Sequence, residues 1–202
     1  NEAKYWARDK PGLASKKPAI QELLKNELRN KRIDLNKELT RELEEAKLMR
    51  NFLHAGNFPG MSIGDPDLYK AFLWRFWALT SNKNGRIGVL FPRSGLSAKG
   101  SEDFRRILFK SVGSIDITTV ENSGRWLFDI HPQYTIALAS ITKQLQSSSN
   151  HLYLRGPFSS LKSFKEEKNE NVQKILISDI LNWNESVSLP LLPKAYSLEV
   201  FS

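Results

Sequence analysis

The chain contains no cysteine, only three histidines and no pair of adjacent prolines. Without cysteine there can be no disulfide framework, thiolate nucleophile or cysteine-ligated metal. The three histidines are far apart in sequence and lack paired carboxylates at ligand spacing, so we expect no metal site. A glycine-rich phosphate loop and a nucleophile elbow are also absent. The residues alone therefore do not make up a complete active site.

Long hydrophobic runs are missing as well. Arg75 interrupts the best candidate, and roughly 18 uncharged apolar residues would be needed to span a membrane. No basic segment followed by an apolar run indicates a secretory signal. We therefore expect a cytoplasmic protein without a membrane partner. Because the first residue is Asn1, we also expect that the native start is missing or has been removed.

The chain does carry an excess of positive charge, and this excess is unevenly placed. The net charge is +8, and residues 1–112 hold 22 of the 30 Lys and Arg but 13 of the 22 Asp and Glu. Positive charge concentrated in this way suits a polyanion partner. A solvated basic surface without a partner explains it equally well.

The first 62 residues predict a basic lead-in followed by two helices. Residues 1–17 look irregular, with a turn at Pro11-Gly12. Pro18 suits the first turn of a helix, and a second amphipathic segment runs from about Asn36 to Ala55. Two helices joined by so short a link should lie antiparallel as a helical hairpin.

Residues 63–150 predict alternating helices and strands. Asp65 should cap a helix that has Pro66 at its first position, runs to about Asn82 and is buried between layers, because it is apolar on nearly every side. A further helix should follow Ser101. The expected strands are 85–92, 115–120 and 134–141. This order implies an α/β sheet whose last pair can be an antiparallel hairpin at the edge.

The last segment, residues 151–202, is less regular and is treated as a C-terminal extension. A charged helix is expected near residues 163–181, and prolines interrupt the tail that follows it.

Two segments resemble one enzyme family in their order along the chain. They are Asp65-Pro66-Asp67-Leu68-Tyr69-Lys70-Ala71-Phe72 and Gly85-Arg86-Ile87-Gly88-Val89-Leu90-Phe91-Pro92. Together they resemble a passage of N6-adenine DNA methyltransferases, above all the large type IIG-like methylases of restriction–modification and phage-exclusion systems. Phe104-Arg105-Arg106, the strand at 115–121 and the hairpin from Phe128 to Ile141 resemble the family's next features. The opening Tyr5-Trp6-Ala7-Arg8 resembles the stretch just after its catalytic tetrapeptide.

This resemblance implies both a fold and an activity. The fold is α/β, the C-terminal half of a class I (Rossmann-like) methyltransferase sheet with a helical-hairpin insertion. The parent protein would be a site-specific DNA methyltransferase that transfers a methyl group from S-adenosylmethionine to adenine N6 in double-stranded DNA. The family's Asn-Pro-Pro-aromatic tetrapeptide and its Gly-rich cofactor motif are both absent here. We therefore expect an inactive fragment whose partner is the rest of the parent polypeptide.

The resemblance also assigns a role to the connection between the second and third strands. Such enzymes flip the target adenine out of the duplex, and an aromatic residue of this connection packs against the base. Phe128 matches that aromatic, and Trp126 and His131 are further candidates for the same pocket. The alternative is that Phe128 only fills the core beneath the hairpin.

Two groups of basic residues are candidates for DNA contacts. Arg93 and Lys99 follow the central strand, at the end where α/β sheets bind ligands. The other group lies in the lead-in and consists of Arg8, Lys10, Lys16 and Lys17. Ordinary surface charge is the alternative for both groups.

Two other functions stay open. One is a non-catalytic nucleic-acid-binding or scaffolding module, which should have a closed sheet. A methyltransferase remnant should instead keep one exposed sheet edge where the missing strands would dock. The other is an unrelated small α/β enzyme, which would need an acid/base or nucleophile cluster that the sequence does not show.

Overall fold

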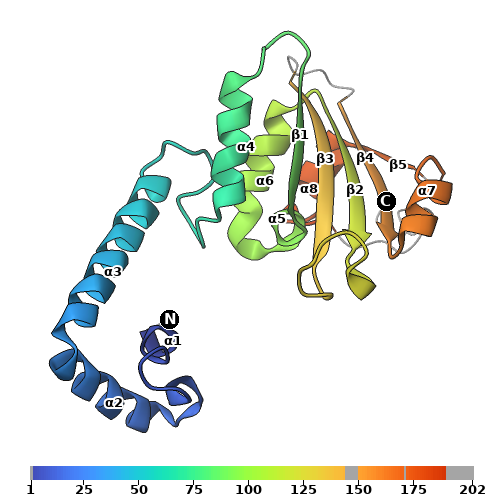
Figure 1. Ribbon diagram of the computed structural model, residues 1–202. Coiled ribbons are helices and arrows are strands. Elements are labelled where there is room, and N and C mark those ends of the chain that lie inside the picture. Colours follow the sequence, from blue (N-terminus) through green and yellow to red (C-terminus); the bar gives the residue numbers. More distant parts are fainter. Residues whose placement is uncertain (1, 144–149, 171, 190–202) are drawn as a thin grey trace. The chain divides into compact units, whose positions relative to one another are not determined.

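The computed structural model describes residues 2–143, 150–170 and 172–189 (Figure 1). The chain divides into two compact units, residues 1–52 and 53–202. The α-helices are α1 (Glu2–Trp6), α2 (Pro18–Lys31), α3 (Ile33–His54), α4 (Leu68–Leu79), α5 (Ser94–Ser97), α6 (Glu102–Ser111), α7 (Leu161–Glu167) and α8 (Ile177–Trp183). The strands are β1 (Gly85–Pro92), β2 (Ser114–Glu121), β3 (Thr135–Lys143), β4 (His151–Phe158) and β5 (Gln173–Leu176). Among the described residues, no helix combines the length and the apolar character that crossing a membrane requires.

The first unit is built around Trp6, whose side chain is completely buried. The buried residues that pack with it are Ala3, Leu13, Leu28 and Leu39. The lead-in, predicted to be irregular, is thus in part the short helix α1. It is followed by a turn in which Gly12 adopts a φ of 81°, a left-handed conformation that glycine accepts without strain.

An ion pair ties α1 to α2 in this unit. The carboxylate of Glu2 accepts hydrogen bonds from Arg29 Nη2 at 2.6 and 2.8 Å. Partial burial works to raise the pKa of Glu2, but the hydrogen bonds from Arg29 and Trp6 and the nearby positive charges outweigh it. The pKa of Glu2 therefore lies below its usual value.

Helices α2 and α3 form as predicted, but they do not lie antiparallel as a hairpin. Arg32 alone separates them, and reversing the chain between two helices takes a loop of about 2–5 residues. Figure 1 shows α3 continuing from α2 at an open angle. As a result, apolar side chains of α3 such as Leu43 and Leu48 stay exposed.

The second unit contains a five-stranded mixed sheet with the order β1-β3-β2-β4-β5. β3 is antiparallel to both of its neighbours, so β1 and β2 run in the same direction. β4 lies parallel to β2, and β5 is antiparallel to β4. The α/β class and the first three strands are confirmed. The β2–β3 pair is antiparallel as predicted, but it lies inside the sheet because β1 pairs with the other side of β3.

Strands β4 and β5 were not predicted from the sequence, and the prediction of one long helix near residues 163–181 is wrong. Helix α7 ends at Glu167, and β5 and α8 follow within the same stretch. The pairing of β5 with β4 supplies main-chain hydrogen bonds that a helix here would not make with the sheet. β4 and β5 therefore extend the same sheet as β1–β3.

One face of the sheet carries the main core. Inward side chains of the strands, such as Ile87, Ile117 and Ala139, pack against residues of α4, α6 and α8. The opposite face, here called the open face, carries Gly88, Leu90, Asp116, Thr118, Leu138 and Ser140. Its residues lie side by side because Leu90 pairs with Leu138, and Leu138 with Thr118, across the strands.

Helix α4 is amphipathic, and the prediction that it is buried between layers is wrong. It begins at Leu68, so Pro66 lies before the helix and is not at its first position. Leu73 and Trp74 are buried, whereas Phe72 and Leu79 are 57% and 70% exposed. The helix packs on one side only because no described element covers the other.

Arg105 of α6 holds the last described segment against this core. Its side chain is fully buried and donates hydrogen bonds to four main-chain carbonyls, those of Gly95, Ala98, Ser186 and Val187. Burial lowers the pKa of this guanidinium, but arginine stays charged in proteins. The charge is therefore satisfied by peptide dipoles from two distant parts of the chain.

Candidate functional site

β1 and β2 run in the same direction, so their carboxyl ends lie at the same end of the sheet, here called the carboxyl edge. Most of the predicted site residues of this unit follow these two ends. Arg93 comes directly after β1, and the connection from Asn122 to Tyr134 follows β2. The main-chain N–H of Arg93 donates to the carbonyl of Thr135 at 2.9 Å, and the N–H of Asn122 donates to the carbonyl of Tyr134 at 3.0 Å. These two bonds join both segments to the beginning of β3.

Phe128 lies half-buried on this edge. Together with Trp126 and Phe164 it packs against a small cluster formed by Val120, Ile136 and Phe158. This cluster lies on the open face, since Val120 and Ile136 alternate with inward residues and pair with each other. The ring thus has apolar support behind it and is partly accessible to solvent.

Trp126 and His131 occupy different surroundings. The indole Nε1 of Trp126 donates to the carbonyl of Glu121 at 2.8 Å, and its ring lies 6.4 Å from that of Phe164. The imidazole of His131 is exposed and meets the exposed ring of Tyr134 edge-on, with centroids 6.2 Å apart. Trp126 is therefore fixed in place, whereas His131 lies on the surface of the connection.

The two basic residues predicted beyond β1 differ in exposure. Arg93 is half-buried, and Lys99, in a short 3-10 helix after α5, is exposed. Neither side chain makes an ion pair within the described ranges of the chain. Arg93 therefore adds a positive charge to the carboxyl edge that holds Phe128.

The basic residues of the lead-in belong to the first unit, and two of them are already paired. Arg8 lies 4.0 Å from the ring centroid of Tyr5 and 3.9 Å from Glu38. Lys10 lies 3.9 Å from Glu27. Lys16 and Lys17 are exposed. These four residues are therefore not equivalent as candidates for contact with a polyanion.

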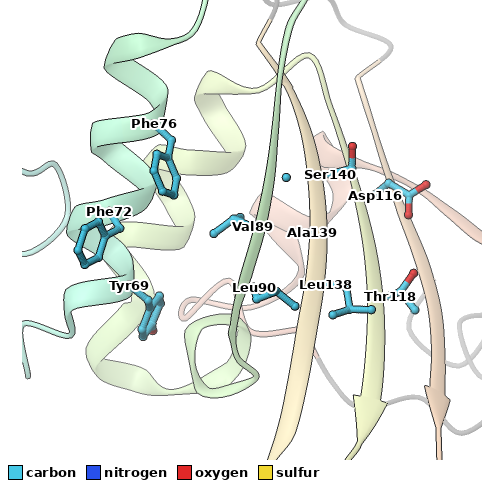
Figure 2. Close-up of a pocket in the computed structure, with 11 residues that line it drawn as sticks. Tyr69, Phe72, Phe76, Val89, Leu90, Asp116, Thr118, Leu138, Ala139 and Ser140 are labelled. Atoms are coloured by element: carbon cyan, nitrogen blue, oxygen red, sulfur yellow. The ribbon is translucent and has the colours of Figure 1, made fainter. Parts of the chain in front are cut away.

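A second feature of the unit is a cavity of about 700 Å³ along β1. Figure 2 shows its lining from two sides, with Phe72 and Phe76 of α4 near one side of β1 and Leu138 on the other. The cavity continues over the open face to Asp116, which pairs with Arg155 of β4. No described strand pairs with the outer side of β1, so this apolar hollow accompanies a free sheet edge.

Tyr69 forms one end of this cavity. Its ring stacks on Phe91 at a centroid distance of 5.8 Å and meets Phe104 edge-on. Burial raises the pKa of the Tyr69 phenol, because the charged phenolate would lose its hydration. The phenol is therefore neutral at physiological pH, and its ring forms part of the cavity wall.

Two features of the site were not recognised from the sequence. One is Asn122, which is completely buried and hydrogen-bonds to the connection that carries Phe128. An asparagine directly after a β-rich run, two residues before a glycine, is a signal for such a turn. The other is the exposed side of α4, which could not be distinguished from its buried side because apolar residues occur on nearly every side of the helix.

The described residues offer no assembled site for a metal or for S-adenosylmethionine. Within residues 2–143, 150–170 and 172–189, no group of three His, Asp or Glu residues could hold a metal ion. β1 is followed by Arg93 and the short α5, and this turn lacks the glycine-rich sequence that receives a dinucleotide-like ligand. The residues present therefore do not fit that cofactor.

Among known proteins, only distant structural likeness to this chain is found. No protein-family model and no curated protein sequence matches the chain. Among solved structures, the chain is similar to the ATP-dependent Type ISP restriction-modification enzyme LlaBIII bound to DNA, with 14% identity and a TM-score of 0.48. The match covers 69% of this chain and 11% of that one, so the chain spans about a tenth of the length of that enzyme.

Proposed function

We propose that this chain is the downstream part of the catalytic domain of a site-specific DNA methyltransferase that modifies adenine N6. Its role there is to supply one wall of the pocket for the flipped adenine and one half of the central sheet. The remaining strands, the cofactor motif and the catalytic tetrapeptide belong to other parts of the parent polypeptide. The isolated chain is expected to transfer no methyl groups.

The observation that carries the proposal is the free edge of β1 beside β3 and β2. A remnant of the methyltransferase sheet needs these three strands as neighbours and one unpaired edge, and the order β1-β3-β2 meets both conditions. An exposed edge strand is a template for pairing with another strand. A self-contained binding module would not need this edge, so the open sheet argues against that alternative.

The surroundings of β1 support the same proposal. Leu90 on the open face is 54% exposed, and Phe72 and Phe76 on α4 are 57% and 40% exposed. These apolar groups lie on both sides of the free edge, around the cavity in Figure 2. A further strand paired with β1 would bury them, which would contribute roughly 25 cal/mol for each Å² of apolar surface removed from water.

The carboxyl edge supports a role in binding a base. Ligands of open α/β sheets bind outside the carboxyl ends of the strands, and Phe128, Trp126 and Arg93 all follow such ends. A half-buried aromatic ring backed by an apolar cluster can stack on a base, while a cation nearby suits phosphate. Because the chain does not fit the cofactor, no chemical step is assigned to its residues.

Methylation by the intact parent polypeptide tests the function. We expect wild-type protein to methylate adenine N6 in duplex DNA and Phe128→Ala to lower kcat/KM roughly 10- to 100-fold, the loss of about 1–3 kcal/mol typical of one base–aromatic stack. The measurement is methyl transfer to duplexes with a single target adenine, with mass analysis of the product base.

The matched control is Phe164→Ala. Phe164 packs on the same cluster from α7, so its loss disturbs the packing without removing the proposed stacking ring. Equal loss of activity in both variants would contradict the stacking role of Phe128. Absence of adenine methylation by the wild-type polypeptide, or absence of an Asn/Asp-Pro-Pro-aromatic motif upstream of this segment, would contradict the function itself.

A further inference from the structure

Asn122 is the residue on which the connection after β2 depends. It follows Glu121, the last residue of the strand, and its side chain has no exposed surface. A buried amide needs partners for both its oxygen and its nitrogen, because each unpaired group costs about 1–3 kcal/mol. The partners of Asn122 therefore show what it holds.

All of these partners belong to the connection itself. The side-chain Oδ1 accepts hydrogen bonds from the main-chain N–H groups of Phe128 at 3.1 Å and Leu127 at 3.4 Å. The side-chain Nδ2 donates to the carbonyls of Phe128 at 2.8 Å and Ile130 at 3.4 Å. Both main-chain groups of Phe128 are thus bound by one amide, which supplies a donor and an acceptor together.

The main-chain N–H and carbonyl of Asn122 also form hydrogen bonds within this connection. Its N–H donates to the carbonyl of Tyr134, and its carbonyl accepts from the N–H of Arg125 at 2.8 Å. Gly124 and Arg125 both have a positive φ, 72° and 57°. Successive left-handed residues turn the chain sharply back towards β2, which brings residues 127–130 within reach of the buried amide.

The result is a defined orientation of the side chains on the connection. Phe128 packs towards Val120 and Ile136, whereas Leu127 and Ile130 are exposed on either side of it. A ring on a loop can bind a base with a fixed geometry only if its main chain is held by neighbouring groups. Asn122 provides this support without reaching the ring.

We infer that Asn122 is the positioning residue of the adenine pocket: it fixes the main chain of Phe128 so that the ring is preorganised to receive a flipped base. This inference rests on the proposed function and deepens it. Asn122 does not contact the base itself, because it lies beneath the connection. Its contribution is the orientation of Phe128.

The first test uses the 202-residue chain and measures hydrogen exchange. Asn122→Ala should speed exchange of the amides of Leu127 and Phe128 at least 10-fold, while amides of β1 and β3 exchange at wild-type rates. The matched control is Asn150→Ala, which also removes an amide-to-carbonyl bond, 2.9 Å from Nδ2 to the carbonyl of Val112, but at the opposite end of β2. It should leave residues 127–130 unchanged.

The second test uses the intact parent polypeptide and DNA with 2-aminopurine at the target position, whose fluorescence rises when the base is flipped. At saturating DNA we expect Asn122→Ala to lower the flipped fraction and kcat about 10-fold, with wild-type cofactor affinity. Asn122→Ser keeps one uncharged hydroxyl that can donate or accept but cannot bind both main-chain groups of Phe128, so it should fall between Ala and wild type. It also serves as the second variant if Asn122→Ala fails to fold.

The outcomes separate the two proposals. Wild-type flipping and methylation together with unchanged flipping in Asn122→Ala would overturn the role of Asn122 alone. Faster exchange at residues 127 and 128 with unchanged flipping would also overturn it, because the loop would then be held for reasons unrelated to the base. A wild-type polypeptide that neither flips nor methylates adenine would overturn the proposed function, and this inference with it.

Discussion

Arg105 is a charged residue whose role is purely structural. It lies in a helix whose sequence, Phe104-Arg105-Arg106, gives no sign that one arginine is buried and the next is at the surface. The buried guanidinium bridges the segment before α6 and the segment after α8, which are distant in sequence. Arg105 thus provides two of the hydrogen bonds that attach the end of the described chain to the core.

Replacing this residue should therefore be costly. Arg105→Met leaves four carbonyls without their donors, and each buried group left unsatisfied costs about 1–3 kcal/mol. We expect the free energy of unfolding to fall by at least about 2 kcal/mol, measured by urea unfolding at neutral pH. Arg106→Met is the control, because Arg106 is more exposed and its guanidinium bonds one carbonyl, that of Glu185, and Glu102. A similar loss in both variants would contradict the special role of Arg105.

For single residues, the sequence predicts the position in the fold better than it predicts the role of the side chain. The family resemblance singles out Phe128, and this residue lies at the carboxyl edge. Trp6 and Arg105 could not be assigned, because their partners are main-chain groups or core residues that come together only when the unit folds. Local residue type does not report such long-range contacts.

Among the elements, the loop before α4 is pressed tightly against the beginning of α6. A Cβ on Gly60 would lie 2.4 Å from the main-chain nitrogen of Phe104, and Gly60 has a φ of 70°. Both conditions exclude a side chain, since atoms this close overlap and left-handed backbone is strained for other residues. Gly60 is therefore required for the loop to pack against α6.

Gly60→Ala should destabilise the second unit by more than about 2 kcal/mol, the sum of left-handed strain and the displacement of α6. The control, Gly56→Ala, separates the two contributions. Gly56 has a φ of 87°, but a Cβ there meets nothing within 4 Å, so only the strain of roughly 1–2 kcal/mol remains. Thermal unfolding followed by circular dichroism distinguishes them, and equal losses would show that α6 yields without cost.

The elements also differ in how well the sequence predicts them. β1, α6, β2 and β3 could be located because each has a run of apolar or β-branched residues bounded by a turn or cap signal. β5 could not, because polarity does not follow burial in its four residues: the polar Gln173 is buried, whereas the apolar Leu176 is exposed. The exposed side of α4 was missed for a different reason. Its residues are apolar, as in a buried helix, but they belong to a surface that the described chain does not cover.

On the scale of the whole molecule, the two units have separate cores. The core of the first consists of a few residues around Trp6, and that of the second joins α4, α5, α6 and α8 to the sheet. Leu53, at the end of α3, already belongs to the second core. Each unit should therefore unfold in a step of its own.

Deleting residues 1–52 tests this separation. We expect the full chain to show two unfolding transitions in denaturant and the truncated chain to retain only that of the second unit, at an unchanged midpoint. Trp6→Ala in the full chain should destabilise the first transition by about 3–5 kcal/mol, as for other buried tryptophans, and leave the second in place. Loss of the sheet signal in the truncated chain would show that the second unit requires the first.

Because β3 lies between β1 and β2 in the sheet but follows both in the sequence, the sheet can form only late in the synthesis of this part of the chain. β1 is complete at Pro92, but neither β1 nor β2 can pair with β3 until residues 135–143 have left the ribosome. Until then β1 has neither of its edges occupied, and α4 has little to cover. The apolar residues of β1 and α4 are therefore exposed on the nascent chain during this period. Assistance from chaperones matters most at that stage.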